Sequence, residues 1–448
     1  MDRLCIVQSA ALDRWDVKHV LGTVWLRPVS QLTRFREIAR RRVESNQLGE
    51  APFGSVHFDG SITLRPPAVT IRGATYLAHP EDLVFSRIDL RNGAIGVVSR
   101  EQGELAFTNE YPIYDIVSSG RVLPGYASLV CRTELFRSQV QALSVGHSGR
   151  KRVSWKQFEE LRIPTPPVAE QQQLITAHQQ QLTDIAQLRS TARQLPLEAV
   201  TTITKMLGLR SPDLTPIKFP FVIASHLSDR WSVFSAIAAV GGTTGEVESA
   251  YPVRLLGSGG LADVSYGISK SPKNRPGRNS RPYLRVANVQ DGYLDLSAIK
   301  YIDVMPDQFA RFRLLRDDVL VCEANGTLAN VARPAIWNDQ IPDCVHQNHV
   351  LRVRASAAVF LPDYLVAYMQ TAPARGYFQR RAKTTTGLFT INSTDVDELP
   401  VPIPPLAVQQ DVARIWKTAR EEADRLVVAA EAAELRVVAD TERRITGG

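Results

Sequence analysis

The chain has few cysteines and no long hydrophobic stretch. Its 448 residues include four cysteines, and none form a C-x-x-C pair, so we expect reduced thiols in a cytoplasmic protein rather than a disulfide framework. No apolar run reaches the roughly 18–20 residues that a membrane helix needs. The N-terminal segment carries an acid at Asp2 and no long apolar stretch before Asp13, which argues against a secretory signal.

Motifs for catalysis and for cofactor binding are also lacking. The glycine-rich stretches at 241–245 and 257–260 fit neither the phosphate-loop nor the dinucleotide pattern. Cys344, His346 and His349 have the chemistry of metal ligands, but the valines around them favour a strand, and no fourth ligand is near in sequence. There is no Asn-Pro-Pro-aromatic methyltransferase tetrad and no convincing nuclease cluster. We therefore expect no metal and no cofactor in this chain.

Positive charge is modestly in excess. Lys and Arg number 53 and Asp and Glu 46, giving a formal charge of +7, which permits a polyanionic partner without proving one. The excess is local between residues 270 and 285, where six bases and no acid stand among Gly, Pro and Asn. Such a loop is suited to phosphate contact, and Arg and Asn can read base edges. The competing interpretation is a solvated loop on a basic protein.

The chain repeats itself on a large scale. A Pro-x-Pro-Pro block followed by Gln-Gln occurs at Pro164–Gln172 and again at Pro402–Gln410, 238 residues later. Asp-Arg-Trp occurs at Trp15 and again at Trp231, and we interpret both tryptophans as buried anchors of each domain in preference to base-stacking platforms. One large unit is therefore used twice, with insertions or deletions between the copies.

Each proline block predicts an extended segment that leads into a helix, since proline fixes φ and suits the first helical turn. After Pro405, apolar residues recur at 3–4 spacing for about four heptads, as in a coiled-coil seam. After Pro167 the pattern is less regular, and Pro196 is expected to break or restart the helix before a second piece at 197–207.

Between these helices the sequence predicts short strands and long loops at 53–135 and 251–355, with helices near 126–143 and 362–378. The predicted class is α+β: two similar recognition domains (a mixed sheet with a few helices), each followed by a long helix, the two helices pairing as an antiparallel coiled coil. The predicted segments are 1–165 (first domain), 166–207 (first spacer helix), 208–225 (linker), 226–402 (second domain) and 403–448 (second spacer helix).

The duplicated proline blocks resemble those of specificity subunits of Type I restriction-modification systems. Two further segments carry the resemblance: Tyr266-Gly-Ile-Ser-Lys270 followed by residues 282–295, and residues 80–98 with a looser counterpart at 316–320. The chain departs from the family at Val408, where the first copy has the usual acid, Glu170. The first half also has no clear counterpart of the segment 266–270.

The resemblance implies a non-catalytic subunit in which each domain binds one half of a split, asymmetric DNA site. It also implies partners: two adenine-specific methyltransferase subunits and ATP-dependent restriction subunits, with S-adenosylmethionine, ATP and Mg²⁺ bound by those partners. The residues expected to bind DNA are Arg87, Arg91, Asn92, Arg150, Lys151, Arg152, Tyr266, Ser269, Lys270, Lys273, Asn274, Arg275, Arg278, Arg281, Asn288 and Asn348. Those expected to contact the methyltransferase subunits are Gln171, Gln172, Ile175, Gln409, Gln410 and Ile415.

The predicted helix has a length that suits this function. Residues 168–195 would span roughly 42 Å as a helix, against about 34–36 Å for one turn of DNA, so a rod of this kind could hold two readers about a turn apart. Two other hypotheses remain: a scaffold with two β-rich modules on a coiled coil and no DNA specificity, and an enzyme in its own right. The enzyme is disfavoured because no catalytic motif is left over.

Overall fold

The computed structural model describes residues 25–46, 51–66, 73–143, 153–210, 247–356, 358–385 and 387–447. The repeated Trp15 and Trp231, the cations Arg150–Arg152 and most of the predicted linker lie outside these residues. The chain divides into two compact units, one comprising Met1–Leu188 with Ala429–Gly448 and the other Arg189–Val428. The first unit is thus built from both ends of the sequence, and the domain boundaries given above stay predictions.

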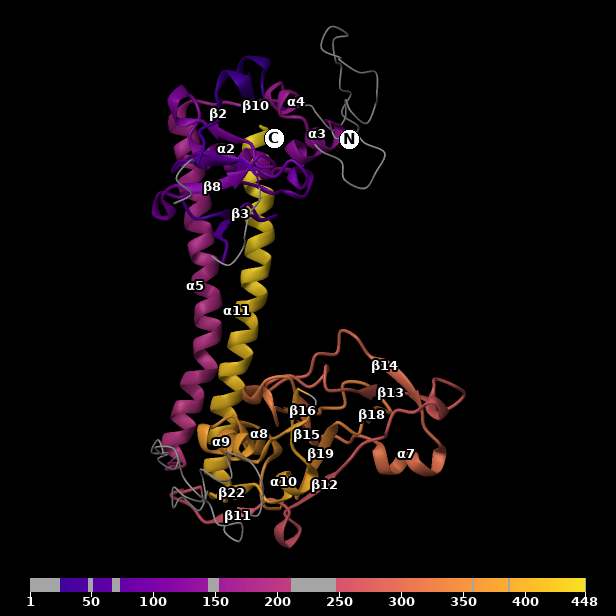
Figure 1. Cartoon of the computed structure of the whole chain (residues 1–448). Coiled ribbons are helices and arrows are strands. Elements are labelled where there is room, and N and C mark those ends of the chain that lie inside the picture. The colour runs from indigo at the N-terminus through magenta and orange to yellow at the C-terminus, as the bar shows by residue number, and fades with distance from the viewer. Residues whose placement is uncertain are drawn as a thin grey trace, which may run out of the picture. The chain divides into compact units, whose positions relative to one another are not determined.

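The first unit is organised around a four-stranded antiparallel sheet with the order β2 (Arg40–Arg42), β9 (Ile113–Asp115), β6 (Leu83–Phe85), β7 (Ile95–Val97). All three residues of β6 are buried, because this strand lies inside the sheet and is covered on both faces. Helices α2 (Pro124–Arg132) and α3 (Glu134–Leu143) pack beside it (Figure 1). Smaller elements complete the unit: β1 (Leu32–Arg34) with β10 (Arg162–Pro164), β3 (Gly54–Val56) with β4 (Ile62–Leu64), β5 (Thr75–Ala78) with β8 (Leu105–Thr108), and α4 (Trp155–Glu159).

The second unit has a sheet of the same order: β12 (Ala262–Ser265), β19 (Val350–Ala355), β15 (Val319–Cys322), β17 (Pro334–Ile336). Again the central strand β15 is wholly buried, and two helices, α8 (Pro362–Met369) and α9 (Ala372–Arg381), occupy the place of α2 and α3. The other elements are β11 (Val253–Leu255) with β22 (Pro400–Pro402), β13 (Ser280–Leu284) with β14 (Lys300–Asp303) and β18 (Val345–His346), β16 (Ala324–Asn325) with β20 (Lys383–Thr385) and β21 (Leu388–Thr390), α7 (Pro306–Phe312) and α10 (Ser393–Asp397).

The two units therefore share a fold, as their duplicated sequence predicts. In each, the residue before a buried Asp adopts a positive φ, Glu81 at 73° and Asp317 at 72°, and that Asp then opens the central strand. The looser sequence match at 316–320 is thus a true structural counterpart of 80–84. The strands form several small sheets, and among the named strand pairs of the described residues only β13–β18 is parallel.

Each unit also contains parts of two long helices, α5 (Val168–Met206) and α11 (Leu406–Thr446). In the first unit they run antiparallel: His178 Nδ1 lies 3.0 Å from Thr441 Oγ1, and Ile185 clusters with Ala430 and Val437. In the second unit, the later part of α5 and the earlier part of α11 share one core, which includes Ile203 and Trp416. The predicted antiparallel pairing is confirmed within the units.

The prediction that Pro196 interrupts the first long helix is wrong, because α5 is continuous across it. Proline removes a single backbone hydrogen bond, whereas the turns that follow bury Ala199, Ile203 and Leu207 in the core of the second unit. This burial outweighs the local loss. No helix of the described residues, α5 and α11 included, carries a stretch apolar enough to cross a membrane.

Candidate nucleic-acid interface

The side chain of the first glutamine in each Gln-Gln pair makes three hydrogen bonds to backbone groups of its own unit, and we call this arrangement the glutamine clamp. Gln171 Nε2 donates to the carbonyls of Arg121 (2.9 Å) and Pro166 (2.8 Å), and its Oε1 accepts from the Leu123 amide (2.9 Å). Gln409 makes the same three bonds, to Val359, Pro404 and Leu361, at 2.9–3.0 Å. Every partner in the second unit lies 238 residues after its counterpart in the first. Each clamp fastens the start of a long helix to the loop before α2 or α8.

This geometry changes the predicted roles of Gln171 and Gln409. Both side chains are buried, 0% and 1% exposed, and their amides are fully engaged inside the chain, so we remove them from the expected contacts with a partner. Ile175 and Ile415 are half-buried and pack on the cores of their own units.

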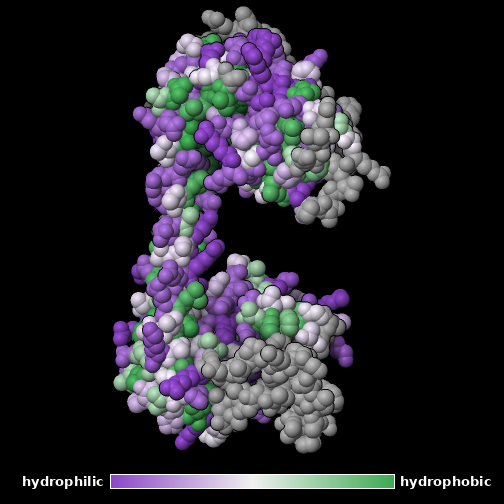
Figure 2. Space-filling view, turned by 60° about the vertical axis from the view of Figure 1, so that its left-hand side comes forward, coloured by the Kyte–Doolittle hydropathy of each residue, from purple (hydrophilic) through white to green (hydrophobic). Residues whose placement is uncertain are grey.

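The neighbouring glutamines, Gln172 and Gln410, are exposed. They stay available to a partner, as do other exposed positions of the long helices, whose visible surface is mostly hydrophilic (Figure 2). Among the described residues, Gln172 Nε2 makes a hydrogen bond only along its own helix, to Thr176 Oγ1 at 3.3 Å.

The basic loop of the second unit leads into β13 and presents four exposed cations: Lys270, Lys273, Arg275 and Arg278. None of them forms an ion pair with another residue that the structure describes. The loop has a definite shape, because Asn274 Oδ1 accepts from the Ser271 amide (2.7 Å) while its Nδ2 donates to the Ser269 carbonyl (2.7 Å). Asn274 therefore holds the loop, and the cations around it are free to meet phosphates.

Two other predicted contacts of this segment have internal partners. Arg281 bonds Asp343 at 3.2 Å and stacks over the Phe309 ring, 4.8 Å from its centre. Asn288 is 2% exposed; its amide donates to the carbonyls of Asp295 and Ala298 and accepts from the Arg285 amide. Because its side chain is buried and satisfied, we do not retain Asn288 as a base reader.

Asn288 instead braces a loop that is anchored to α11. Gly292 in this loop has φ +84°, and a Cβ there would lie 2.7 Å from the Trp416 ring. Arg420 of α11 stacks over Tyr293, 4.5 Å from the ring centre. The sequence motif at 288–295 thus fixes the β-rich part of the second unit to the long helix.

Tyr266 and Asn348 are brought to the same region by backbone pairing. The Ile268 amide donates to the His346 carbonyl (2.8 Å), and the Asn348 amide donates to the Ile268 carbonyl (3.0 Å). Gly267 permits this approach, because a Cβ would lie 2.0 Å from the His346 carbonyl oxygen. The Tyr266 hydroxyl accepts from the Ser393 amide at 3.1 Å, so the start of the basic loop, Asn348 and the α10 region share one surface.

In the first unit, the predicted residues follow β6. Arg87 is half-buried, and its carbonyl accepts from the Val153 amide (3.0 Å), the residue that follows Arg150–Arg152. Arg91 is half-buried, while Asn92 is exposed and bonds Asp89 at 3.1 Å.

A basic strand, β2, was not among the predicted DNA contacts, although its three residues are all arginines. Arg40 is exposed, and Arg41 stacks over Trp155, 4.6 Å from the ring centre, with Lys156 on the same ring. Five arginines within residues 34–42 could have signalled this surface. Arg42, in contrast, is directed inward.

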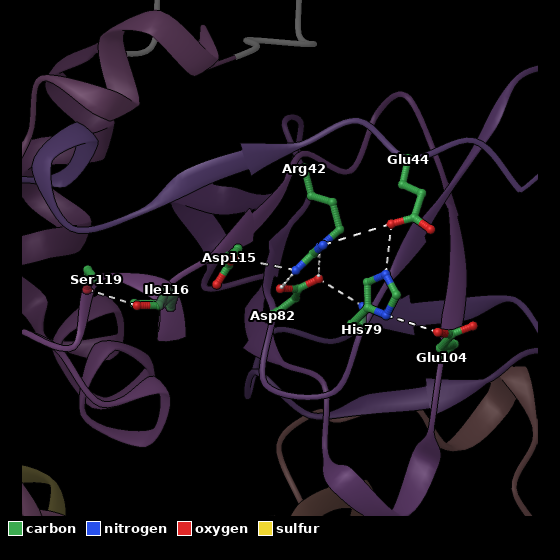
Figure 3. Close-up of polar contacts among 8 residues, drawn as sticks. All are labelled: Arg42, Glu44, His79, Asp82, Glu104, Asp115, Ile116 and Ser119. Atoms are coloured by element: carbon green, nitrogen blue, oxygen red, sulfur yellow. Dashed lines mark hydrogen bonds and ion pairs between the residues drawn. The ribbon is translucent and has the colours of Figure 1, made fainter.

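Arg42 belongs to a network of acids and bases (Figure 3). It donates to both carboxylate oxygens of buried Asp82, at 2.7 and 3.2 Å, and lies 3.7 Å from Asp115. This hydrogen bond raises the pKa of Arg42, whereas burial raises the pKa of Asp82. The pair holds the loop before β6 and is neutralised internally, so Arg42 is not available to phosphate.

His79 extends the network at the surface. Its Nε2 lies 2.9 Å from Glu44 and its Nδ1 2.9 Å from Glu104. Carboxylates only accept hydrogen bonds, so both contacts form together only when the ring carries two protons. The bond from His79 lowers the pKa of Glu44.

Of the cysteine and histidine residues weighed as metal ligands, His346 lies in β18, Cys344 directly precedes that strand, and His349 lies in the turn before β19. Cys344 and His346 are buried, and His346 Nδ1 donates to the Val350 carbonyl at 2.7 Å. Burial raises the pKa of Cys344 to about 12 and lowers that of His346 to about 4. In the described part of the chain, no three His, Cys, Asp or Glu side chains group closely enough to hold a metal. The interpretation of this segment as strand is confirmed for Val345–His346 in β18 and from Val350 onward in β19, whereas Asn348 and His349 form a turn between them.

Comparison with known proteins gives matches to specificity subunits of Type I restriction enzymes. The chain is 22% identical over 339 residues to the EcoKI specificity subunit of a Type I restriction enzyme from Escherichia coli K12, covering 75% of this chain and 67% of that protein. It is 25% identical over 135 residues to the MjaX type I restriction enzyme specificity subunit of Methanocaldococcus jannaschii, itself a provisional assignment, covering 30% and 32%.

A chain with the same fold occurs in a solved structure of a type I restriction-modification system. That structure concerns the assembly of the complex and its conformational transition. The TM-score is 0.58 at 14% identity, covering 92% of this chain and 96% of that one. No family model matches the sequence. In its duplicated sheet order, its paired long helices and its sequence, the chain is similar to specificity subunits of Type I restriction enzymes.

Proposed function

We propose that the chain is the non-catalytic DNA-recognition subunit of its restriction-modification complex and binds a bipartite, asymmetric duplex site. The observation that carries this proposal is that the two units share one fold but expose different basic residues. The second unit offers a loop with four unpaired cations, whereas the first offers an arginine strand beside Trp155. Two DNA-binding units that share a fold but differ in their surface residues would bind two unlike half-sites.

The long helices carry the second part of the proposal. Their exposed residues, including Gln172 and Gln410, would dock two methyltransferase subunits and, through them, ATP-dependent restriction subunits. S-adenosylmethionine, ATP and Mg²⁺ would act in those partners. The helices would also set the number of unread base pairs between the half-sites.

Methylation mapping tests this function. The chain is produced with the methyltransferase subunit of its own system, and methylated sites are identified across a genome. We expect two short unlike sequences separated by a fixed gap. One short contiguous palindrome would contradict the proposal.

Salt dependence separates DNA recognition from the scaffold alternative. Binding through phosphate contacts releases counterions, so duplex affinity should fall steeply between about 50 and 200 mM salt. A chain that binds only proteins, with no duplex affinity at low salt, would instead be a scaffold.

A further inference from the structure

A cavity of about 400 Å³ with both polar and apolar walls opens on the second unit and includes no residue of the basic loop. Its wall includes Glu323, His349, Lys383, Thr390 and Asn392. Neither the sequence motifs nor the relatives assign it a role. All of these residues lie within one unit, so the cavity is a feature of that unit alone.

Hydrogen bonds order the polar groups of this cavity. His349 Nδ1 lies 2.5 Å from Glu323 Oε2, and since the carboxylate only accepts, the histidine donates. Asn348 Nδ2 lies 3.4 Å from His349 Nε2 and can donate to it. The amide thus supports the imidazole, which in turn orients the carboxylate.

This arrangement leaves one acceptor facing the cavity. The Glu323 side chain is only 18% exposed, and its second carboxylate oxygen has no hydrogen-bond partner among the described residues. This oxygen is not among the buried atoms that lack a partner, so it is accessible from the cavity and can accept a hydrogen bond from a ligand. Lys383, exposed at the cavity wall, has no ion pair in the described part of the chain and supplies a positive charge next to this acceptor.

The surroundings suit duplex DNA. Lys383 lies on β20, an edge strand of the three-stranded sheet β16–β21–β20, and an exposed lysine on such an edge can reach a phosphate. The Tyr266 hydroxyl, just before the basic loop, accepts from the Ser393 amide, next to Asn392 in the cavity wall. The start of the basic loop is therefore linked by a hydrogen bond to the residue that follows Asn392 of the cavity wall.

We infer that this cavity reads one base pair through the exocyclic amine of adenine or cytosine, accepted by Glu323, while Lys383 contacts a phosphate. In the major groove those two bases present an amino donor, whereas guanine and thymine present only acceptors to the same position. A carboxylate therefore attracts the first pair and repels the second. This inference rests on the proposed DNA-recognition function and adds a specificity-determining residue to it.

Selection from a randomised duplex pool tests the inference. The full chain, its Glu323→Gln variant and its Lys383→Ala variant are each used to select bound duplexes, which are then sequenced. We expect wild type to prefer adenine or cytosine about fivefold or more at one position. Glu323→Gln, which has the same shape but offers a donor as well, should admit guanine there and leave every other position unchanged.

Lys383→Ala should weaken binding to all selected duplexes alike, and reduce the slope of log affinity against log salt by about 0.9. Lys417→Ala, an exposed lysine of α11, is the charge-matched control and should change neither. Since Lys383 is exposed, its removal reports on DNA contact even if Glu323→Gln impairs folding, which thermal unfolding detects.

The outcomes distinguish this inference from the function on which it rests. A wild-type preference that Glu323→Gln leaves the same at every position would overturn the inference and preserve DNA recognition. Unchanged affinity and salt slope for Lys383→Ala would overturn the phosphate contact. No sequence enrichment by wild type would overturn both the inference and the proposed function.

Discussion

At the scale of single residues, each unit buries an equivalent aspartate, but the arginine that neutralises it comes from a different strand. Asp82 and Asp318 are 2% and 1% exposed and stand at equivalent positions before β6 and β15. Asp82 is bound by Arg42 of β2, whereas Asp318 is bound by Arg354 of β19 with two bonds of 2.7 Å. A buried carboxylate needs a charged partner, which comes from the adjacent strand β19 in the second unit and from β2, one strand further away, in the first.

The unpaired cations of the basic loop give the first prediction. Replacing Lys270, Arg275 and Arg278 with Ala should weaken duplex binding and lower the salt slope by about 0.9 for each phosphate that the loop no longer neutralises. The measurement is duplex affinity of the full chain across a salt series. Arg414, Arg425 and Arg443, each paired with an acid on α11, form a matched triple control. Unchanged affinity at moderate salt would remove the loop from the interface.

The glutamine clamp gives a second prediction. Gln409→Ala removes three hydrogen bonds and leaves the Leu361 amide without its partner, so we expect a loss of about 2–4 kcal/mol of stability. Chemical unfolding of the full chain measures it. Gln410→Ala, one residue along and exposed, should stay within about 0.5 kcal/mol of wild type. Equal effects of the two substitutions would mean that the clamp contributes nothing.

Buried His346 gives a prediction about pH. Its folded-state pKa of about 4 lies below the ordinary value of 6.5, so between those pH values the unfolded chain binds a proton that the folded chain does not. Its contribution to stability is complete above pH 6.5 and is lost as pH falls toward 4, by a few kcal/mol.

Unfolding by urea at pH 4.5 and pH 7 checks this prediction. His346→Gln keeps a donor for the Val350 carbonyl but cannot titrate, so it should show a smaller loss of stability at low pH. An identical pH dependence in both proteins would show that His346 is not the titrating group.

At the scale of elements, α5 illustrates how packing overrides a local signal. Pro196 lies inside this 39-residue helix and deprives the Ala192 carbonyl of its usual donor. The turn before it buries Ala192, and the turns after it bury Ala199 and Ile203. Helical packing on both sides therefore sustains a conformation that proline disfavours.

Pro196→Ala tests this account. Alanine restores the backbone donor and removes the ring, so the helix should gain about 1–3 kcal/mol. Thermal unfolding of the full chain measures the gain. Glu198→Ala, at an exposed position two residues on, is the control and should have little effect. A loss of stability in Pro196→Ala would mean that a bend at Pro196 is part of the folded helix.

At the scale of the whole molecule, the chain closes its first unit with its last residues. Ile445 of α11 is 0% exposed in the core of that unit. Arg27 donates to the carbonyls of Arg444 (2.6 Å) and Ile445 (2.9 Å) and pairs with Glu170 on α5. Folding of the first unit therefore depends on contacts between residues more than 400 positions apart.

An exchange of residues 1–165 for those of a relative tests the independence of the units. We expect only one half of the recognised sequence to change, because each unit has its own sheet and its own exposed cations. Methylation mapping of the exchanged chain with its methyltransferase reports the result. A change in both halves would show that the units do not read DNA independently.

The sequence alone determined the architecture of this protein, since it depends on local and repeated signals. Proline blocks, 3–4 periodicity and β-rich composition predicted two α+β modules with long helices, because each pattern acts through nearby backbone geometry. The constant offset of 238 residues, carried by the proline blocks, also anticipated the shared fold.

Which side chains remain free for a partner depends on the three-dimensional packing of the chain. Gln171, Gln409 and Asn288 stood in the motifs that led to the family, yet each is buried and satisfied by carbonyls distant in sequence. Arg42 and Arg40 are two residues apart, and one is neutralised by Asp82 while the other is exposed. Hydrogen-bond satisfaction depends on which segments meet in space, and a linear pattern does not contain that information.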